Sequence, residues 1–143
     1  MESGGRDRGS GIGDGGQDQI MKIRNYRDLH VWQKSMELVI ECYRIAGQFP
    51  KHEIYGLSSQ LRRAVVSVAA NIAEGHERSH RKEYLQHLSI SYGSLAEVET
   101  HLEIALCLQY IDREEHDKLV EKSATIGRML NALKRSLASI PVP

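Results

Sequence analysis

Residues 56–75 constrain the fold most strongly, because they predict a single helix crowded with small side chains. Apolar residues recur there at spacings of three and four, which places them on one face of a helix with about 3.6 residues per turn. This face consists of Leu57, Leu61, Ala64, Val65, Val68 and Ile72. Ala69, Ala70 and Ala73 widen it, and Gly75 is a residue type that commonly follows a helix end. Such short side chains allow close approach by a neighbouring helix, so the segment is expected to belong to a helical bundle.

Three further segments show helical periodicity, at about residues 29–46, 80–109 and 112–140. The residues on the core-facing side of the first segment are Leu29, Trp32, Met36, Val39, Tyr43 and Ala46. Those of the second segment are Leu85, Leu88, Leu95, Val98, Leu102 and Ala105. Those of the third segment are Leu119, Ser123, Ile126, Leu130, Leu133, Leu137 and Ile140. Pro50 separates the first two helices, and Asp112 with Glu115 predicts a capping box at the start of the fourth. Because the connections are short, the predicted fold is an all-α, antiparallel, up-down-up-down four-helix bundle.

The chain divides into a tail and one domain. Its 143 residues and 41% hydrophobic content suit one core. Residues 1–20 hold seven of the 12 glycines, so we expect a disordered tail before a bundle domain at 21–143. Residues 1–20 lack the apolar region of a signal peptide, and no apolar run reaches the roughly 20 residues of a membrane span. A cytoplasmic location without membrane contact is therefore expected.

Three segments carry a resemblance to a known family. They are residues 29–34 (Leu-His-Val-Trp-Gln-Lys), residues 49–50 with 55–75, and residues 93–100 (Gly-Ser-Leu-Ala-Glu-Val-Glu-Thr). Together they resemble the 23S-rRNA intervening-sequence proteins over nearly the whole chain after residue 20. The resemblance implies a four-helix bundle that assembles into a ring-shaped homopentamer, binds nucleic acid and has no catalytic activity. Distant relatives of this family accompany the reverse transcriptases of diversity-generating retroelements.

Apolar residues outside the main seams predict self-association, since one bundle cannot bury them all. They are Val66, Ala69, Ala73, Ile104, Leu106 and Leu108. A patch of small residues in the third helix is expected to face the second helix, and it consists of Ser89, Ser91, Gly93 and Ser94. Trp32, Tyr43 and Tyr84 are interpreted as core aromatics, with base stacking as the alternative. Cys42 and Cys107 are interpreted as reduced, structural thiols.

Charge is balanced overall but unevenly distributed, with 19 basic and 19 acidic residues. The predicted topology brings eight basic residues to one end of the bundle, and we expect them to bind nucleic acid. They are Lys22, Arg24, Arg27, Arg78, Arg81, Lys82, Lys134 and Arg135, with Asp28, Glu74, Glu77 and Glu83 among them. The opposite end carries Glu53, Asp112, Glu114, Glu115 and Asp117. The alternative is that these charges only complement helix dipoles and hydrate exposed faces.

Four residues match positions of the family motif without a defined role. Arg62 and Arg63 are expected to pair with Glu97 or Glu99, or to contact a ligand. Asn71 and Glu74 lie three residues apart on one helical face. Their expected role is hydrogen bonding across the turn between the second and third helices, and contact with a ligand or partner is the alternative.

His76-Glu77-Arg78-Ser79-His80 reproduces the H-E-x-x-H pattern of zinc metallopeptidases. That chemistry needs both histidines on one face of a continuous helix. Because Gly75 is expected to end one helix and Ser79 to cap the next, the motif is predicted to straddle a turn, leaving His87 or Glu83 as the only further ligand candidates. We therefore predict no metal, no cofactor and no catalytic residue.

Two hypotheses about function follow. The first is a non-catalytic homo-oligomer that binds RNA or single-stranded DNA through its basic end. The alternative is a protein-interaction scaffold or an accessory subunit of a reverse transcriptase or another RNA-handling enzyme.

Overall fold

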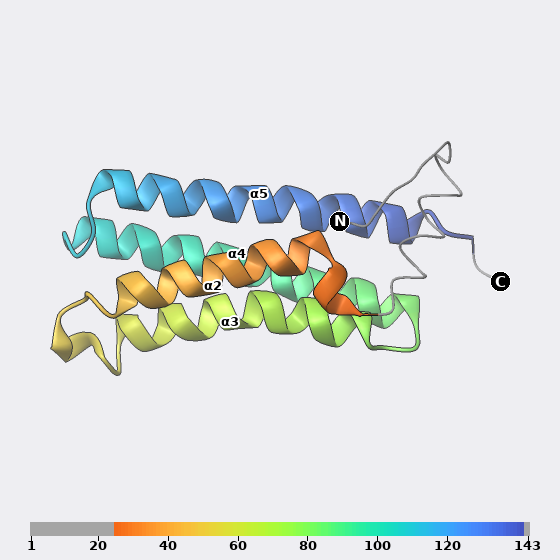
Figure 1. The fold of residues 1–143 in the computed structure, drawn as a ribbon, viewed down its shortest axis with the longest axis horizontal. Coiled ribbons are helices and arrows are strands. Elements are labelled where there is room, and N and C mark those ends of the chain that lie inside the picture. The colour runs from red at the N-terminus through yellow and green to blue at the C-terminus, as the bar shows by residue number, and fades with distance from the viewer. Residues whose placement is uncertain (1–24, 142–143) are drawn as a thin grey trace.

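The computed structural model describes residues 25–141 and is all-helical over that range (Figure 1). Its elements are η1 (Tyr26–Asp28), α2 (His30–Ala46), η2 (Lys51–Glu53), α3 (Leu57–His76), α4 (Arg81–Cys107) and α5 (Arg113–Ala138). The four long helices begin and end within a few residues of the predicted positions. The predicted disordered tail, together with Lys22 and Arg24, lies outside the described residues.

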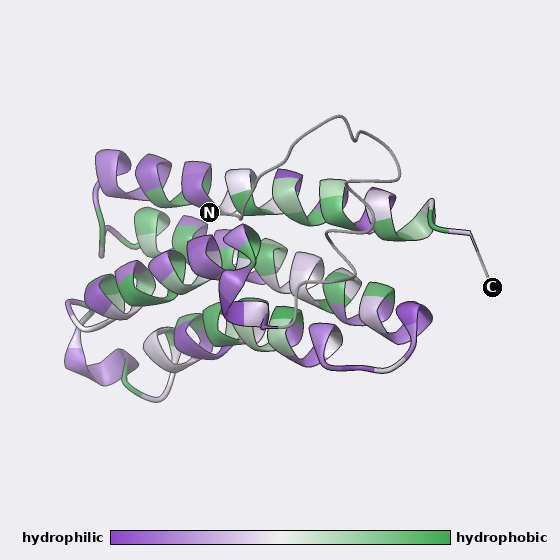
Figure 2. Ribbon diagram, turned by 45° about the vertical axis from the view of Figure 1, so that its right-hand side comes forward, coloured by the Kyte–Doolittle hydropathy of each residue, from purple (hydrophilic) through white to green (hydrophobic). Residues whose placement is uncertain are grey.

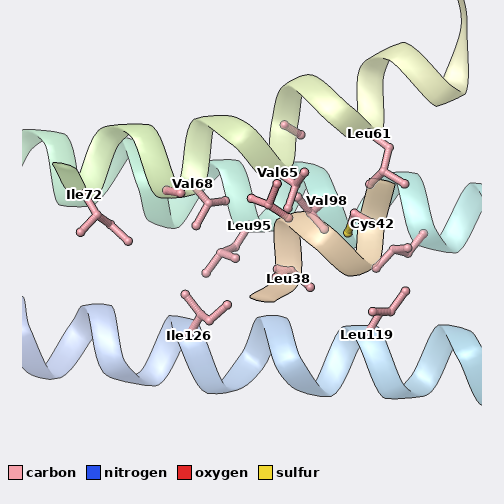
Figure 3. Packing of buried hydrophobic residues seen from close by; sticks show 14 of the residues in the cluster. Leu38, Cys42, Leu61, Val65, Val68, Ile72, Leu95, Val98, Leu119 and Ile126 are labelled. Carbon is pink, nitrogen blue, oxygen red and sulfur yellow. The ribbon is translucent and has the colours of Figure 1, made fainter. Parts of the chain in front are cut away.

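One hydrophobic core lies between the four helices (Figure 3). Each helix contributes completely buried aliphatic side chains, among them Leu38 of α2, Val65 of α3, Leu102 of α4 and Leu119 of α5. Burying one such side chain contributes about 1.5–3 kcal/mol. Hydrophobic and hydrophilic residues alternate along the helices in the way that amphipathic helices require (Figure 2).

Small residues hold α3 and α4 close together, as the sequence predicted. The Ser91 hydroxyl donates to the Val68 carbonyl at 2.8 Å, and the Ser67 and Ser94 hydroxyls lie 2.8 Å apart. Ser89 and Gly93, which were predicted to share this contact, are instead exposed. The serines that turn inward satisfy their hydroxyl groups on the facing helix, which buried polar groups require.

Gly75 was predicted to follow the end of its helix, and that prediction is wrong. Gly75 is buried within α3, which continues to His76. A Cβ atom at Gly75 would lie 2.7 Å from His87 Cβ and 3.1 Å from Tyr84 Cδ1. The residue is therefore needed because α4 approaches the α3 backbone too closely for any side chain.

The predicted N-cap residue is confirmed at the start of α5, whereas the N-cap predicted for α4 is wrong. Asp112 accepts a hydrogen bond from the Glu115 backbone N–H at 2.8 Å. The Glu115 carboxylate does not complete the capping box, because it pairs with Arg44 at 2.6 Å. The N-cap of α4 is His80 rather than Ser79, and it makes no side-chain capping bond.

Long-range contacts connect the helix ends. The Tyr110 hydroxyl donates to Glu53 at 2.7 Å, so the α2–α3 and α4–α5 connections lie together. The Arg44–Glu115 pair brings the end of α2 beside the start of α5. Arg81 donates to the Ile140 carbonyl, which places the start of α4 beside the residues that follow α5.

Two predictions of side-chain burial are wrong. Tyr43 is 44% exposed, with the Arg62 guanidinium 5.4 Å from its ring centroid, and Ala69 is buried between helices. Tyr84 is buried as predicted, whereas Trp32 is half-buried and packs edge-on against Tyr26.

The apolar surface predicted from residues outside the main helical seams is only partly confirmed. Val66, Ile104 and Leu108 are exposed, while Ala73 and Leu106 are half-buried.

Both cysteines are free, as predicted. Burial raises the pKa of the Cys42 thiol to about 12, so this side chain is protonated and unreactive at neutral pH. Cys107 is exposed at the end of α4 rather than packed in the core.

A glycine-to-alanine pair tests the close approach of α3 and α4. Gly75→Ala should lower the free energy of unfolding by about 1–3 kcal/mol, because the new methyl group meets His87 and Tyr84. Gly93→Ala is the matched control, since no atom lies within 4 Å of its added Cβ. The control should raise stability by about 0.5–1 kcal/mol through helix propensity. Urea unfolding measures both, and effects of the same sign would contradict the packing.

Acid sensitivity should reveal the contacts of Glu53. Hydrogen bonds from the Leu57 backbone N–H and the Tyr110 hydroxyl lower the pKa of this carboxyl group. A lowered pKa stabilises the fold above the ordinary glutamate pKa of about 4.3, and this contribution is lost as pH falls through the folded-state value. Glu53→Gln should therefore lower the melting temperature at pH 7, with the gap to the parent closing in acid. Glu114→Gln is the control, because Glu114 lies at the same end of the bundle and has no bound partner among residues 25–141. Its melting temperature should equal that of the parent at both pH values.

Candidate functional site

Four basic residues from the α3–α4 turn, the start of α4 and the last turn of α5 lie at one end of the molecule, and we call them the basic cluster. They are Arg78, Arg81, Lys82 and Arg135. The Arg81–Ile140 contact places the start of α4 beside the residues that follow α5. Figure 1 shows the α3–α4 turn and the last turns of α5 at the same end of the molecule.

The members of the basic cluster differ in how their charge is compensated. Arg78 pairs with Glu74 at 2.6 Å, and Arg81 donates to the Ile140 carbonyl. Lys82 and Arg135 are exposed, and neither has a carboxylate within ion-pair distance among residues 25–141. Lys82 and Arg135 can therefore bind an anion without first breaking an ion pair or a side-chain hydrogen bond within residues 25–141.

Two other predicted cations, Arg27 and Lys134, make contacts outside the basic cluster. Arg27 belongs to η1, which contacts α2 and α3 but neither α4 nor α5. Figure 1 shows η1 beside α3, whereas Arg81 and Lys82 begin α4. Lys134 points along α4, where its Nζ lies 5.7 Å from the centroid of the Tyr92 ring. These contacts do not join Arg27 or Lys134 directly to a member of the basic cluster.

The opposite end is acidic, but most of its carboxylates are engaged by the protein itself, Glu114 being an exception. Glu53 accepts from Tyr110 and from the Leu57 backbone, and Glu115 pairs with Arg44 and Lys118. His116 lies between Glu103 at 3.0 Å and Asp117 at 2.8 Å. Further members are Asp112 and Glu114. This end therefore uses its charges to join the helices, in contrast to the basic cluster.

Asn71 connects α3 and α4, as the sequence predicted. Its Nδ2 donates to the Ser67 carbonyl at 2.9 Å, so its Oδ1 is the atom that lies 2.9 Å from His87 Nδ1. This arrangement requires His87 Nδ1 to carry the proton. Glu74 accepts from Arg78 of the α3–α4 turn. Asn71 and Glu74 thus order the α3–α4 turn and the start of the basic cluster.

The H-E-x-x-H motif spans a turn, in agreement with the sequence. His76 is the last residue of α3 and His80 precedes α4. The His76 ring packs edge-on against Tyr84 at 5.8 Å. Within residues 25–141 no group of three ligating side chains could hold a metal ion.

The predicted pairing of Arg62 and Arg63 with Glu97 or Glu99 is wrong. Arg62 lies over the Tyr43 ring of α2, and Arg63 contacts Ser59 on its own helix at 3.4 Å. Glu99 faces α5 instead, where its Oε2 accepts from the Ser123 hydroxyl at 2.6 Å. Arg62 therefore belongs to the α2–α3 face of the molecule, whereas the contact of Arg63 with Ser59 lies within α3.

Sequence reasoning missed a surface cavity of about 320 Å³ between α4 and α5. Its wall includes Tyr92, Glu99, Ser123, Gly127 and Asn131. Gly127 lies in the middle of α5, where glycine disfavours a helix by about 1 kcal/mol relative to alanine. Gly127 was the sequence feature that could have indicated the cavity, because a glycine inside a long helix often has a packing or functional reason.

Together the helices and the basic cluster define a small all-helical protein of four packed helices. Residues 27–132 match the family model described as 23S rRNA-intervening sequence protein, and the chain therefore belongs to this family. No helix within residues 25–141 has the length and apolar character needed to cross a membrane.

A crystal structure similar to this chain is that of a protein of unknown function from the S23 ribosomal protein family of Bacteroides thetaiotaomicron. The two are 25% identical, the TM-score is 0.67, and the match covers 73% of this chain and 98% of the other. A comparison with curated proteins finds no match.

Tyr84 offers a test of packing beside the basic cluster. Its hydroxyl is buried and has no hydrogen-bond partner among residues 25–141, and burial raises the pKa of the phenol. Tyr84→Phe should therefore raise the free energy of unfolding by about 1 kcal/mol, because an unsatisfied polar group is removed. Tyr110→Phe is the control and should destabilise the protein, since that hydroxyl bonds Glu53. Thermal unfolding compares them, and a loss of stability in Tyr84→Phe would contradict this account.

Proposed function

We propose that this protein is a non-catalytic, cytoplasmic homo-oligomer that binds nucleic acid, as RNA or single-stranded DNA, through the basic cluster. The observation that carries the proposal is the presence of two exposed cations without carboxylate partners, Lys82 and Arg135, on neighbouring helix ends. Phosphate groups of a nucleic acid are the natural ligands of such cations, and counterion release favours their binding. Exposed Arg78 can add to the contact if Glu74 releases it.

The distribution of charge supports this proposal. Glu53, Glu114 and Glu115 lie at the opposite end from the basic cluster, so the groups that repel phosphate and those that attract it are separated along the molecule. The family name refers to 23S rRNA, and the similar crystal structure belongs to the S23 ribosomal protein family. Both names favour RNA as the first ligand to test.

The proposal includes an antiparallel up-down-up-down order of the helices and assembly into a homopentameric ring. The contacts between helix ends, Tyr110–Glu53 and Arg81–Ile140, support that order. Val66, Ile104 and Leu108 expose apolar surface that a neighbouring protomer can cover. A ring would repeat the basic cluster around one rim and let weak phosphate contacts act together.

A second candidate is a protein-interaction scaffold or an accessory subunit of a reverse transcriptase or another RNA-handling enzyme. The exposed apolar residues favour it, since the surface that suits a second copy also suits another protein. In that case the basic cluster would be incidental to partner binding.

Binding of the full chain to a fluorescein-labelled 13-nucleotide oligouridine, followed by anisotropy across a salt series, tests the proposal. We expect the double variant Lys82→Glu, Arg135→Glu to weaken binding. The slope of log affinity against log salt should become less steep by about 1.4 for each protomer that contacts the RNA. Lys51→Glu with Arg113→Glu makes the same charge change on residues of the opposite end and should alter the slope little.

Light scattering of the parent and both double variants measures their oligomeric mass, which helps to distinguish nucleic-acid binding from the scaffold function. If both double variants retain the parent mass, a loss of binding in the first alone supports the basic cluster. Equal losses in both would show that binding depends on net charge rather than on this site. If the parent binds no oligouridine at low salt, the scaffold hypothesis replaces nucleic-acid binding.

A further inference from the structure

The cavity between α4 and α5 has a volume that can hold one small planar group. Its volume of about 320 Å³ falls at the lower end of the range of about 300–1,000 Å³ for small-molecule sites. Gly127 keeps it open, because the helix presents only backbone there. A Cβ at Gly127 would lie 3.4 Å from Tyr92 Cε1 and 3.7 Å from Leu95 Cδ1, which is ordinary contact. Packing would therefore accept alanine at this position.

Tyr92 provides an aromatic wall to this cavity. Its side chain lies against Gly127 and yet is 44% exposed. An aromatic ring supported by backbone and open to solvent can stack against a nucleobase. Lys134 Nζ lies 5.7 Å from the centroid of this ring, within reach of a phosphate next to a stacked base.

Glu99 provides a fixed hydrogen-bond acceptor. Its Oε2 accepts from the fully buried Ser123 hydroxyl at 2.6 Å, which orients the carboxylate. Its Oε1 has no donor within hydrogen-bond distance among residues 25–141. Arg128, a cation of the same cavity wall, pairs with Glu121 at 3.3 Å instead. The cavity thus offers a half-buried carboxylate that lacks a cationic partner.

A carboxylate discriminates strongly between nucleobases. Guanine presents two adjacent donors, N1–H and the N2 amino group, on its Watson–Crick edge. Adenine and cytosine present an amino group beside a ring acceptor, and uracil presents one N–H between two carbonyl oxygens, so each of them would direct an acceptor at Glu99. A bidentate contact of this kind corresponds to a discrimination of about 5- to 150-fold.

The cavity is also connected with the basic cluster. Lys134 is the residue before Arg135 on α5, and it leads from that cluster to Tyr92. From these observations we propose that the α4–α5 cavity binds one unstacked guanine of a single-stranded RNA, with Tyr92 stacking on the base, Glu99 accepting from its Watson–Crick edge and Lys134 contacting its phosphate. This inference rests on the proposed function and adds a base-specific site to it.

Three fluorescein-labelled RNAs test this site on the full chain: 13 uridines, the same RNA with a central guanosine, and the same RNA with a central inosine, which lacks the N2 amino group. The guanosine RNA should bind about 5- to 150-fold more tightly than oligouridine, and inosine should lose most of that gain. Tyr92→Ala and Glu99→Gln should each reduce the preference for guanosine while leaving oligouridine binding nearly intact. Glu97→Gln, an exposed carboxylate on the same helix, is the matched control and should preserve the preference.

Gly127→Ala separates the site from the stability of the fold. It should favour the α5 helix and raise the melting temperature, yet narrow the cavity and reduce the guanosine preference. Equal, salt-sensitive affinities for the three RNAs would overturn the guanine site and leave the proposed function standing. Absence of binding to all three would overturn both. A change of oligomeric mass in Glu99→Gln, measured by light scattering without RNA, would show that the cavity holds a side chain of another protomer and would overturn the site.

Discussion

The close contact between α3 and α4 is the interaction on which the other features depend. Gly75 leaves no room for a side chain between the helices, and the hydrogen bonds of Ser91 and Ser94 hold α4 against α3. Asn71 extends the contact to His87. This pairing positions the α3–α4 turn and with it Arg78, Arg81 and Lys82. The basic cluster is therefore a consequence of how two helices of small residues pack.

The two ends of the molecule use charge differently. Around Tyr110 and Glu115, carboxylates accept hydrogen bonds and ion pairs from the chain itself, which stabilises the connections between helices. Around the α3–α4 turn, Lys82 and Arg135 remain exposed to solvent without such partners. The net charge of zero does not reveal this difference, because the acidic residues at one end cancel the basic residues at the other in the sum.

Helical periodicity predicted the four helices well, since burial of one face follows directly from spacing along the chain. Predictions that required the distance between two helices were less successful. Gly75 was taken for a terminator, Tyr43 for a core residue, and Glu99 for a partner of Arg62 or Arg63, although it bonds Ser123. The α4–α5 cavity was missed because it depends on the rotation of two helices about their axes, which periodicity alone does not specify.

Hydrogen–deuterium exchange of the full chain, with and without the guanosine-containing RNA, tests the central claim that one end of the molecule binds nucleic acid. The account predicts slower exchange around residues 77–83 and in the last turns of α5, with no change around residues 51–56 and 109–113. Protection confined to the Tyr110 end, or spread evenly over the four helices, would contradict it.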